Sequence, residues 1–184
     1  MMPGLLDRVR NTRFSVVRRS GSVAVVVTVG TFQLCGLLGI RINTSPSLPV
    51  GLYLVTTEEN ANLAEFCPAE PIAALSLARG YRSPGVCQDG GAPLLKPIVA
   101  KCGDQVELSA RGICVNGRLL ANTVPLTKDT KGRPLKSWPL GHFEVVPGTV
   151  WVASSYDSRS FDSRYFGPLS TGAIRHRLKA LLTL

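Results

Sequence analysis

A long apolar segment near the N-terminus constrains the fold of this chain more than any other feature. Residues 22–40 are mostly Val, Leu, Gly and Thr, with Gln33 as their one strongly polar member. As a helix, this run would measure roughly 28 Å, close to the ~30 Å hydrocarbon core of a bilayer. A buried core helix is the alternative, but an uninterrupted run of this length favours a membrane-spanning anchor.

The charges around this segment predict its orientation. Residues 1–21 contain five arginines and one aspartate, and no further charged residue follows until Arg41. The positive-inside rule therefore places residues 1–21 in the cytoplasm and residues 41–184 on the outer side of the membrane. A cleaved signal peptide is the alternative, but the run is longer than a typical h-region and no small-x-small site precedes Arg41. We expect an uncleaved, single-span membrane anchor. The basic terminus lacks interleaved aromatic residues, so no nucleic-acid partner is expected.

The composition of the rest of the chain predicts a mainly β domain over residues 41–184. The 18 Gly and 13 Pro among 184 residues disfavour a helical bundle, and 18% charged residues are too few for a disordered polyelectrolyte. Asn116-Gly117 is a strong hairpin signal, and Pro97 indicates a sheet edge or a bulge. The expected strands are 50–56, 94–99, 105–108, 113–115, 118–120, and a pair 143–146 and 149–153, with 174–184 as a strand or a short helix. Residues 58–92 are expected to be mainly loop, and 121–141 an exposed excursion.

Four cysteines lie in the part that is predicted to be exported. In an oxidising compartment, Cys67, Cys87, Cys102 and Cys114 suggest two disulfides, for which three connectivities exist. Proximity in the sequence favours Cys67–Cys87 and Cys102–Cys114. Metal binding is the alternative, but the chain has no Cys-x-x-Cys pair, so no metal site is expected.

Lys96 is an unusual residue because it lies within the apolar stretch Leu94–Val99. Burial lowers the pKa of a lysine, and a lysine with a lowered pKa can act as a general base for a serine nucleophile. A lysine at a strand edge whose ammonium group reaches solvent is the plainer interpretation, and composition alone slightly favours it.

Three motifs around this lysine occur in a recognisable order. The first is Asn43-x-x-x-Ser47-x-Pro49-x-Gly51-Leu52-Tyr53, directly after the apolar segment. Lys96 is followed seven and eight residues later by Gly103-Asp104, and the block 160–167 reads Ser-Phe-Asp-Ser-Arg-Tyr-Phe-Gly. In this order, the chain resembles the serine–lysine signal peptidase family, and within it the conjugative-transfer (TraF-type) branch of pilin-processing peptidases. The resemblance implies a signal-peptidase-like antiparallel β domain with an N-terminal transmembrane helix. It also implies that the helix lies in the bacterial inner membrane, with residues 41–184 in the periplasm.

The resemblance also implies a catalytic dyad. Ser47 would be the nucleophile, and Lys96 the general base that takes its proton. Ser45 is the rival nucleophile, but it lies where the wider family places a hydroxyl that stabilises the oxyanion. Lys101 is a rival base by chemistry, but Lys96 has the family's spacing to Gly103-Asp104.

The C-terminal block supplies three further residues by the same resemblance. Ser160 would orient the lysine, Asp162 would be the acidic residue that the conjugative branch needs for activity, and Arg164 would pair with Asp162. A plain surface ion pair between the last two, worth ~0–1 kcal/mol, is the alternative. No cofactor is implied.

The sequence departs from general signal peptidases at three places. Leu48 follows the nucleophile in place of Met, Pro97 follows the base in place of Arg, and residues 154–156 (Ser-Ser-Tyr) replace a Gly-Asp-Asn stretch. These differences favour a dedicated processing enzyme. Its expected partners are a pilin-like precursor with small residues before the cleavage site, the membrane and the conjugation machinery. A non-enzymatic β domain that scaffolds a mating channel and a general signal peptidase are the alternatives.

Overall fold

The computed structural model of this chain describes residues 38–184. The chain divides into two units, residues 1–41 and 42–184. The predicted cytoplasmic segment 1–21 and most of the predicted anchor 22–40 lie outside the described residues. Of the anchor's last three residues, Leu38 and Gly39 form a turn and Ile40 begins a strand. Within residues 38–184, no helix has both the length and the hydrophobicity that a membrane span requires.

Strands dominate the described part of the chain, as the composition predicts. The α segments there are one helix of two turns and one of a single turn. In chain order, the elements are β1 (Ile40–Asn43), β2 (Gly51–Thr56), β3 (Leu63–Phe66), α2 (Ile72–Ala78), β4 (Leu94–Ala100), β5 (Gln105–Ser109), β6 (Gly112–Val115), β7 (Arg118–Leu119), β8 (Gly141–Glu144), β9 (Thr149–Val152), α3 (Ser163–Phe166), β10 (Leu169–Ser170), a 3-10 turn (Thr171–Ala173) and β11 (Ile174–Thr183). The mainly β fold class is confirmed for this part.

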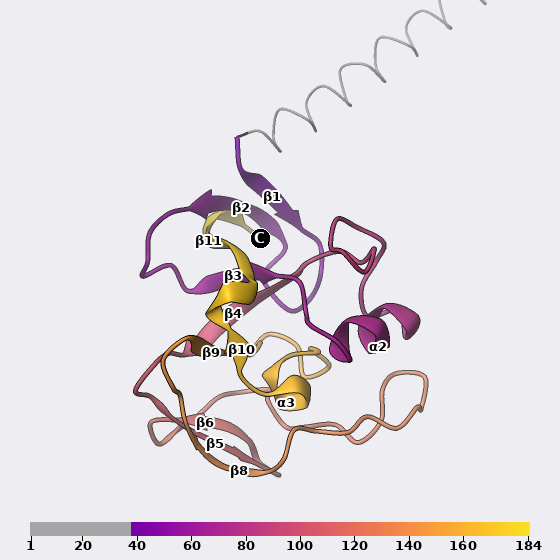
Figure 1. Cartoon of the computed structure of the whole chain (residues 1–184), viewed down its shortest axis with the longest axis vertical. Helices are drawn as coiled ribbons and strands as arrows, with labels where there is room; N and C mark the ends of the chain where they lie inside the picture. The colour runs from indigo at the N-terminus through magenta and orange to yellow at the C-terminus, as the bar shows by residue number, and fades with distance from the viewer. Residues whose placement is uncertain (1–37) are drawn as a thin grey trace, which may run out of the picture. The chain divides into compact units, whose positions relative to one another are not determined.

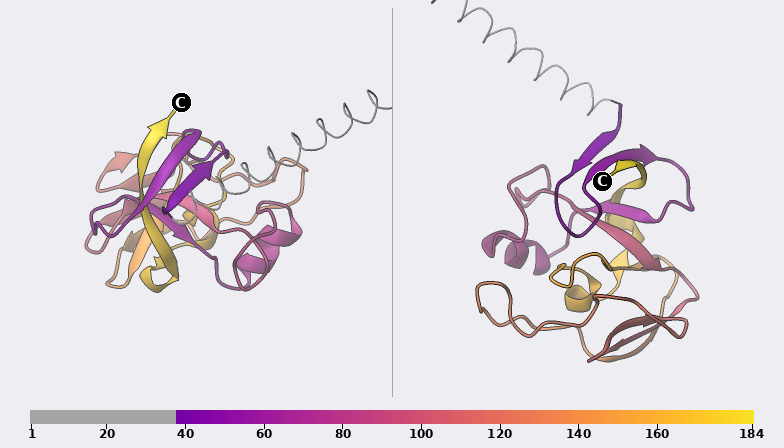
Figure 2. Two further views of the ribbon diagram at one scale, coloured as in Figure 1. Left: turned by 90° about the horizontal axis from the view of Figure 1, so that it is seen from above. Right: turned by 180° about the vertical axis from the view of Figure 1, so that it is seen from behind.

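The strands form two sheets. The larger has seven strands in the order β1-β2-β11-β3-β4-β9-β10, and the smaller has four in the order β7-β6-β5-β8. The C-terminal strand β11 lies between β2 and β3 and pairs with both in antiparallel fashion. The end of the chain therefore joins the first two strands, β1 and β2, to the rest of the larger sheet. Figure 1 shows β5, β6 and β8 as a separate layer below the larger sheet, and Figure 2 shows β11 crossing beside β2.

Three apolar clusters hold these sheets together. One packs Phe66, Ile98 and Val152 from the centre of the larger sheet. Another joins the two sheets through Trp151 and Ile113, with their neighbours. The third lies beneath the segment that precedes β2 and includes Leu48, Tyr53, Leu63 and Leu178. The candidate nucleophile is the residue before Leu48, so the third cluster anchors the segment that carries it.

The hairpin prediction at Asn116-Gly117 is confirmed. Both residues have positive φ, 49° and 82°, which a tight hairpin turn demands and which an Asn-Gly pair adopts at little cost. The turn joins β6 to β7, with Val115 opposite Arg118. Most other expected strands are present within two residues, and the tail, left open between strand and helix, is a strand.

The structure corrects one predicted strand pair and decides between the two alternatives for Pro97. β8 and β9 do not pair with each other around residues 147–148, because β8 adds to β5 and β9 adds to β4. Nor is β4 a sheet edge, since it lies between β3 and β9. The Ile98 N–H donates to the Asn62 carbonyl beside β3, whereas the Pro97 carbonyl accepts from the Ala153 N–H just after β9. The nitrogen of Pro97, which has no hydrogen to donate, therefore faces the end of β9. The β4–β9 register shifts between Ile98 and Ala100, close to the predicted bulge.

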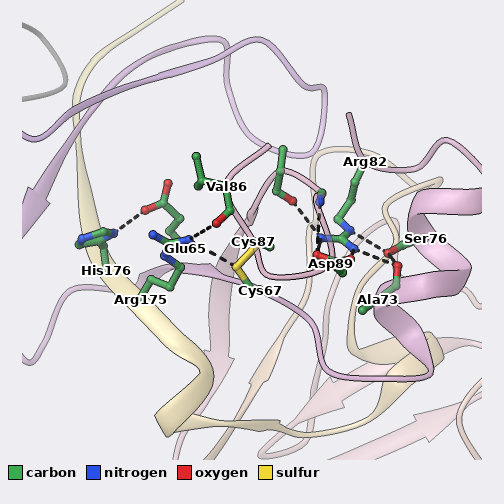
Figure 3. The surroundings of a disulfide bond; sticks show 12 residues. Glu65, Cys67, Ala73, Ser76, Arg82, Val86, Cys87, Asp89, Arg175 and His176 are labelled. Carbon is green, nitrogen blue, oxygen red and sulfur yellow. Dashed lines mark hydrogen bonds and ion pairs between the residues drawn. A yellow bond between two sulfur atoms is a disulfide. The ribbon is translucent and has the colours of Figure 1, made fainter. Parts of the chain in front are cut away.

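The predicted disulfide Cys67–Cys87 is present, and it closes a ring with a sequence separation of 20. Cys67 directly follows β3, and Cys87 lies in the loop before β4. Figure 3 shows the guanidinium of Arg175 against the Cys67 sulfur and the Val86 carbonyl. The ring contains α2, so the bridge ties this helix to the edge of β3.

The predicted disulfide Cys102–Cys114 is absent, and both thiols are free. In the β5–β6 hairpin, Cys114 lies opposite Glu107, whereas Cys102 precedes β5 in an exposed turn. The hairpin register therefore places Cys114 five residues along from Cys102. Proximity in the sequence misled here because the position of the turn sets which residues face each other across a hairpin.

Candidate active site

The segment that carries Ser47 is held by the side chain of Asn43, at the end of β1. The Asn43 amide nitrogen lies 3.0–3.1 Å from the carbonyl oxygens of Ser45, Leu48 and Pro49. Its amide oxygen accepts from the Ser45 backbone N–H at 3.2 Å. One buried side chain thus contacts four backbone groups of a segment that forms no strand, with its two N–H donors shared among three carbonyls.

Two other residues of the first motif fix the same segment from β2. The hydroxyl of the buried Tyr53 donates to the Pro49 carbonyl at 2.6 Å. Gly51 is required by packing, because a Cβ at this position would lie 2.1 Å from the carbonyl oxygen of Leu182 on β11. The motif residues around Ser47 therefore have structural tasks that the sequence alone did not assign.

The hydrogen bonds of two hydroxyls define where the Ser47 proton points. Ser45 Oγ lies 2.9 Å from the Asn43 amide oxygen, which can only accept, so Ser45 donates its one hydroxyl hydrogen there. Ser45 and Ser47 have their Oγ atoms 3.0 Å apart. Because the Ser45 hydrogen is committed, Ser47 is the donor in this bond. Ser47 is 6% exposed and Ser45 is exposed, so the two hydroxyls differ in burial as well.

Lys96 is buried on β4, with 5% of its surface exposed. It lies on the face of the strand that also carries Leu94 and Ile98. Its Nζ atom donates to Ser160 Oγ at 2.9 Å. Burial lowers the pKa of Lys96 to about 8, although the carboxylates of Asp162 and Asp157 oppose this shift. The structure therefore contradicts the interpretation of Lys96 as a lysine that reaches solvent at an edge.

Ser47 and Lys96 face the same pocket, whose volume is about 200 Å³. Ser45 and Ser160 line it as well, so four of the predicted site residues meet there. Lys101, the rival base, is exposed in the turn after β4 and is not among the lining residues. The remaining lining residues are Pro46, Tyr81, Leu94, Leu126, Asp129, Thr130, Leu135, Asp157, Arg159 and Phe161.

Asp162 and Arg164 form a fully buried ion pair, which rules out a pair on the surface. Both side chains are 0% exposed, and the Arg164 guanidinium contacts both carboxylate oxygens at 2.8 and 2.9 Å. Asp162 also caps α3 by accepting from the Arg164 backbone N–H. The guanidinium further donates to the Ser160 carbonyl at 2.7 Å. The pair lies behind the pocket and holds the backbone of Ser160, and it does not line the pocket itself.

Sequence reasoning missed the outer wall of the pocket, which contains Tyr81 and Asp129. Asp129, in the expected excursion 121–141, accepts from the Tyr81 hydroxyl and from Arg133 Nε, each at 2.6 Å. Burial raises the pKa of Asp129, but these hydrogen bonds outweigh it and hold the pKa well below its usual range. The carboxylate thus fastens the excursion to Tyr81 next to the pocket. No motif marks these residues, because they lie 48 positions apart in the sequence.

The described residues contain no group of three or more His, Cys, Asp or Glu side chains that could hold a metal ion. The side chains that line the pocket include hydroxyls, a lysine and carboxylates. A buried serine hydroxyl in the same pocket as a lysine of lowered pKa suits nucleophilic catalysis on an acyl group.

The chain matches known proteins over most of its length. Residues 13–182 match the family model of signal peptidases, peptidase S26. A plasmid transfer protein TraF of Escherichia coli is 31% identical over 167 residues, which cover 89% of this chain and 92% of that protein. A conjugal transfer protein TraF of Agrobacterium fabrum is 34% identical over 161 residues, with coverages of 84% and 88%.

One solved structure is also similar. A signal peptidase I of Enterococcus faecalis is 19% identical, and the match covers 68% of this chain and 99% of that one. Its TM-score of 0.35 is too low to support a conclusion about shared architecture.

Proposed function

Because this chain belongs to the signal peptidase family, peptidase S26, we propose that it is a serine endopeptidase with Ser47 as nucleophile and Lys96 as general base. One observation carries the proposal: a buried lysine with a pKa of about 8 shares a pocket with a buried serine hydroxyl. About a tenth of such a lysine is neutral at pH 7, and the neutral form can accept a proton.

The reaction begins with the Ser47 hydroxyl. Its hydrogen turns from Ser45 to the neutral amine of Lys96 while Oγ attacks the carbonyl carbon of the scissile peptide bond. Ser160, bonded to Nζ, holds the lysine for this transfer. The lysine then gives the proton to the leaving amine. Lys96 then takes a proton from water while the water oxygen attacks the acyl carbon. The bond between Ser47 Oγ and that carbon breaks, Lys96 returns the proton to Ser47 Oγ, and the acyl group leaves as a carboxylic acid.

The oxyanion of the tetrahedral intermediate needs hydrogen-bond donors. The Ser47 backbone N–H is one candidate, and one such donor is typically worth ~3–4 kcal/mol. The Ser45 hydroxyl is the second, but its hydrogen points to Asn43 in the resting structure. To take part, the Ser45 hydroxyl must turn its hydrogen away from Asn43.

The substrate that we propose is a conjugative pilin precursor with small residues before its cleavage site. Support comes from the relatives, which are plasmid and conjugal transfer proteins. Residues 22–40 would anchor the enzyme in the inner membrane, with residues 41–184 in the periplasm beside the conjugation machinery. The acyl-enzyme could also be attacked by the pilin's own N-terminal amine, which would give a cyclic product in place of a linear one.

The test is the intact mass of such a precursor after co-expression with the enzyme. We expect conversion to the mature mass with the unchanged enzyme, and none with Ser47→Ala or Lys96→Ala. Lys101→Ala is the matched control, since it removes an exposed lysine outside the pocket, and it should process normally. A cyclic product would weigh a further ~18 Da less than the linear one, because one water is not added. Processing by both dyad variants would refute the proposal and favour a non-enzymatic scaffold.

A further inference from the structure

We propose that Ser154 is a positioning residue that fixes the peptide group of the nucleophile Ser47; this inference rests on the proposed function. Ser154 follows β9 and is 0% exposed. Its Oγ lies 2.6 Å from the Ser47 carbonyl oxygen, across 107 residues of sequence. Because a carbonyl oxygen can only accept, the Ser154 hydroxyl is the donor.

The Ser154 hydroxyl has no freedom to turn elsewhere. Its oxygen also accepts from the backbone N–H groups of Tyr156, at 3.1 Å, and Asp157, at 3.4 Å. With two donors directed at its lone pairs, the single hydroxyl hydrogen is left to the Ser47 carbonyl. The segment 154–157 thus holds the hydroxyl in one orientation.

The backbone of Ser154 is fixed in turn by the buried ion pair. Its N–H donates to the Asp162 carboxylate at 3.1 Å, and Arg164 binds the same carboxylate. A continuous chain of hydrogen bonds therefore runs from Arg164 through Asp162 and Ser154 to Ser47. Asp162 acts on the nucleophile through this chain, since its own oxygens lie outside the pocket.

The nucleophile segment is thereby held from two sides. Asn43 binds the carbonyls of Ser45, Leu48 and Pro49, and Ser154 binds the carbonyl of Ser47 that lies between them. General signal peptidases have a Gly-Asp-Asn stretch in place of residues 154–156, so a glycine replaces Ser154. Glycine has no hydroxyl that could donate to the Ser47 carbonyl. The second support is therefore a feature of this chain's own sequence.

The expected effect of losing this bond falls on turnover. A shift of about 1 Å in a reacting atom can reduce the rate ~100-fold. Ser154 does not line the pocket, so substrate binding should be little changed. We expect Ser154→Ala to lower kcat roughly 10- to 100-fold with KM within about twofold. The pH midpoint of kcat should not move, because the contacts of Lys96 are untouched.

The experiment uses the full chain in detergent micelles and an internally quenched peptide that spans the processing site of the pilin precursor. Ser163→Ala is the matched control, since Ser163 is also 0% exposed and its Oγ accepts from the Val152 N–H of β9. It should lose comparable stability but keep kcat. Ser154→Cys, with similar volume and a weaker donor, should give an intermediate kcat.

Two results would overturn the inference. The first is a kcat of Ser154→Ala equal to that of Ser163→Ala, and the second is a change in the KM of Ser154→Ala with no change in its kcat. If Ser154→Ala does not fold, then Ser154→Cys decides, and full turnover by that variant would refute the role. Cleavage by Ser47→Ala would instead show that the proposed function is wrong, so the two failures are distinguishable.

Discussion

Two arginines are buried in this domain, and they differ in what they hold. Arg164 and its partner Asp162 are both 0% exposed at their side chains. The Arg82 side chain is 1% exposed, but its partner Asp89 is 17% exposed. Each guanidinium binds one carboxylate and several backbone carbonyls, as a buried guanidinium must.

The difference lies in the neighbours. Arg164 reaches the Ser160 carbonyl and, through Asp162, the Ser154 backbone, so its contacts lead to the pocket. Arg82 donates to Ser76 and to the Ala73 carbonyl, both in α2, inside the ring closed by the disulfide (Figure 3). The same chemical arrangement thus supports the proposed catalytic groups in one region and stabilises a disulfide-closed loop in the other.

The largest expected effect separates the two arginines. Arg164→Met leaves a fully buried carboxylate without its partner, which should cost ~3–5 kcal/mol of unfolding free energy. Arg82→Met should cost less, ~1–3 kcal/mol, because Asp89 reaches water. Urea unfolding measures both values, and kcat at a temperature where both variants are folded should fall only for Arg164→Met. Equal loss of kcat in the two variants would mean that the clusters do not differ in function.

The second prediction concerns the lysine beside the Arg164 cluster. The folded pKa of about 8 lies below the 10.5 of a solvent-exposed lysine, so the unfolded chain binds more protons between these values and stability rises with pH there. Below pH 8, both states are protonated and the burial cost is complete. At pH 7, the unfolding free energy of Lys96→Met should therefore be about 3 kcal/mol higher than that of the unchanged protein. This gain should shrink as pH rises from about 8 to 10.5, and a pH-independent gain would contradict the assignment.

The third prediction concerns the Arg82 region. Replacing both Cys67 and Cys87 by Ser should lower the unfolding free energy by ~3 kcal/mol, as expected for a ring of this length. Because Tyr81 lies in the ring and lines the pocket, KM should rise more than kcat falls. The control replaces the free thiols Cys102 and Cys114 by Ser, and it should change stability by less than ~1 kcal/mol. A larger effect from the control would show that those thiols are bridged.

The smallest effect is a shift in pH dependence. The Asp162 carboxylate raises the pKa of Lys96 against the effect of burial, so Asp162→Asn should move the pH midpoint of kcat/KM to below 8. Asp89→Asn, in the other cluster, should leave the midpoint unchanged. A pH–rate profile over pH 6–10 measures both, and a midpoint that rises in Asp162→Asn would refute the electrostatic coupling.

Local patterns in the sequence predicted those structural features that depend on residues close together in the chain. The Asn116-Gly117 turn follows from backbone preference, and Lys96 was singled out because its strand neighbours are apolar. The motifs around Ser47 and Ser160 indicated which residues share the pocket. Pairing between segments was less predictable: β8 and β9 join different sheets, and Cys102 does not face Cys114.

By itself, the sequence determined the fold class, the family and the residues that the family's motifs contain, because these depend on composition, spacing and local backbone preference. Only the tertiary structure decided that Asp162 is buried, that Asp129 fastens the outer wall to Tyr81, and that Ser154 holds Ser47. These contacts join residues from separate strands and loops. Their partners are chosen by sheet register and chain closure, and no local pattern encodes those.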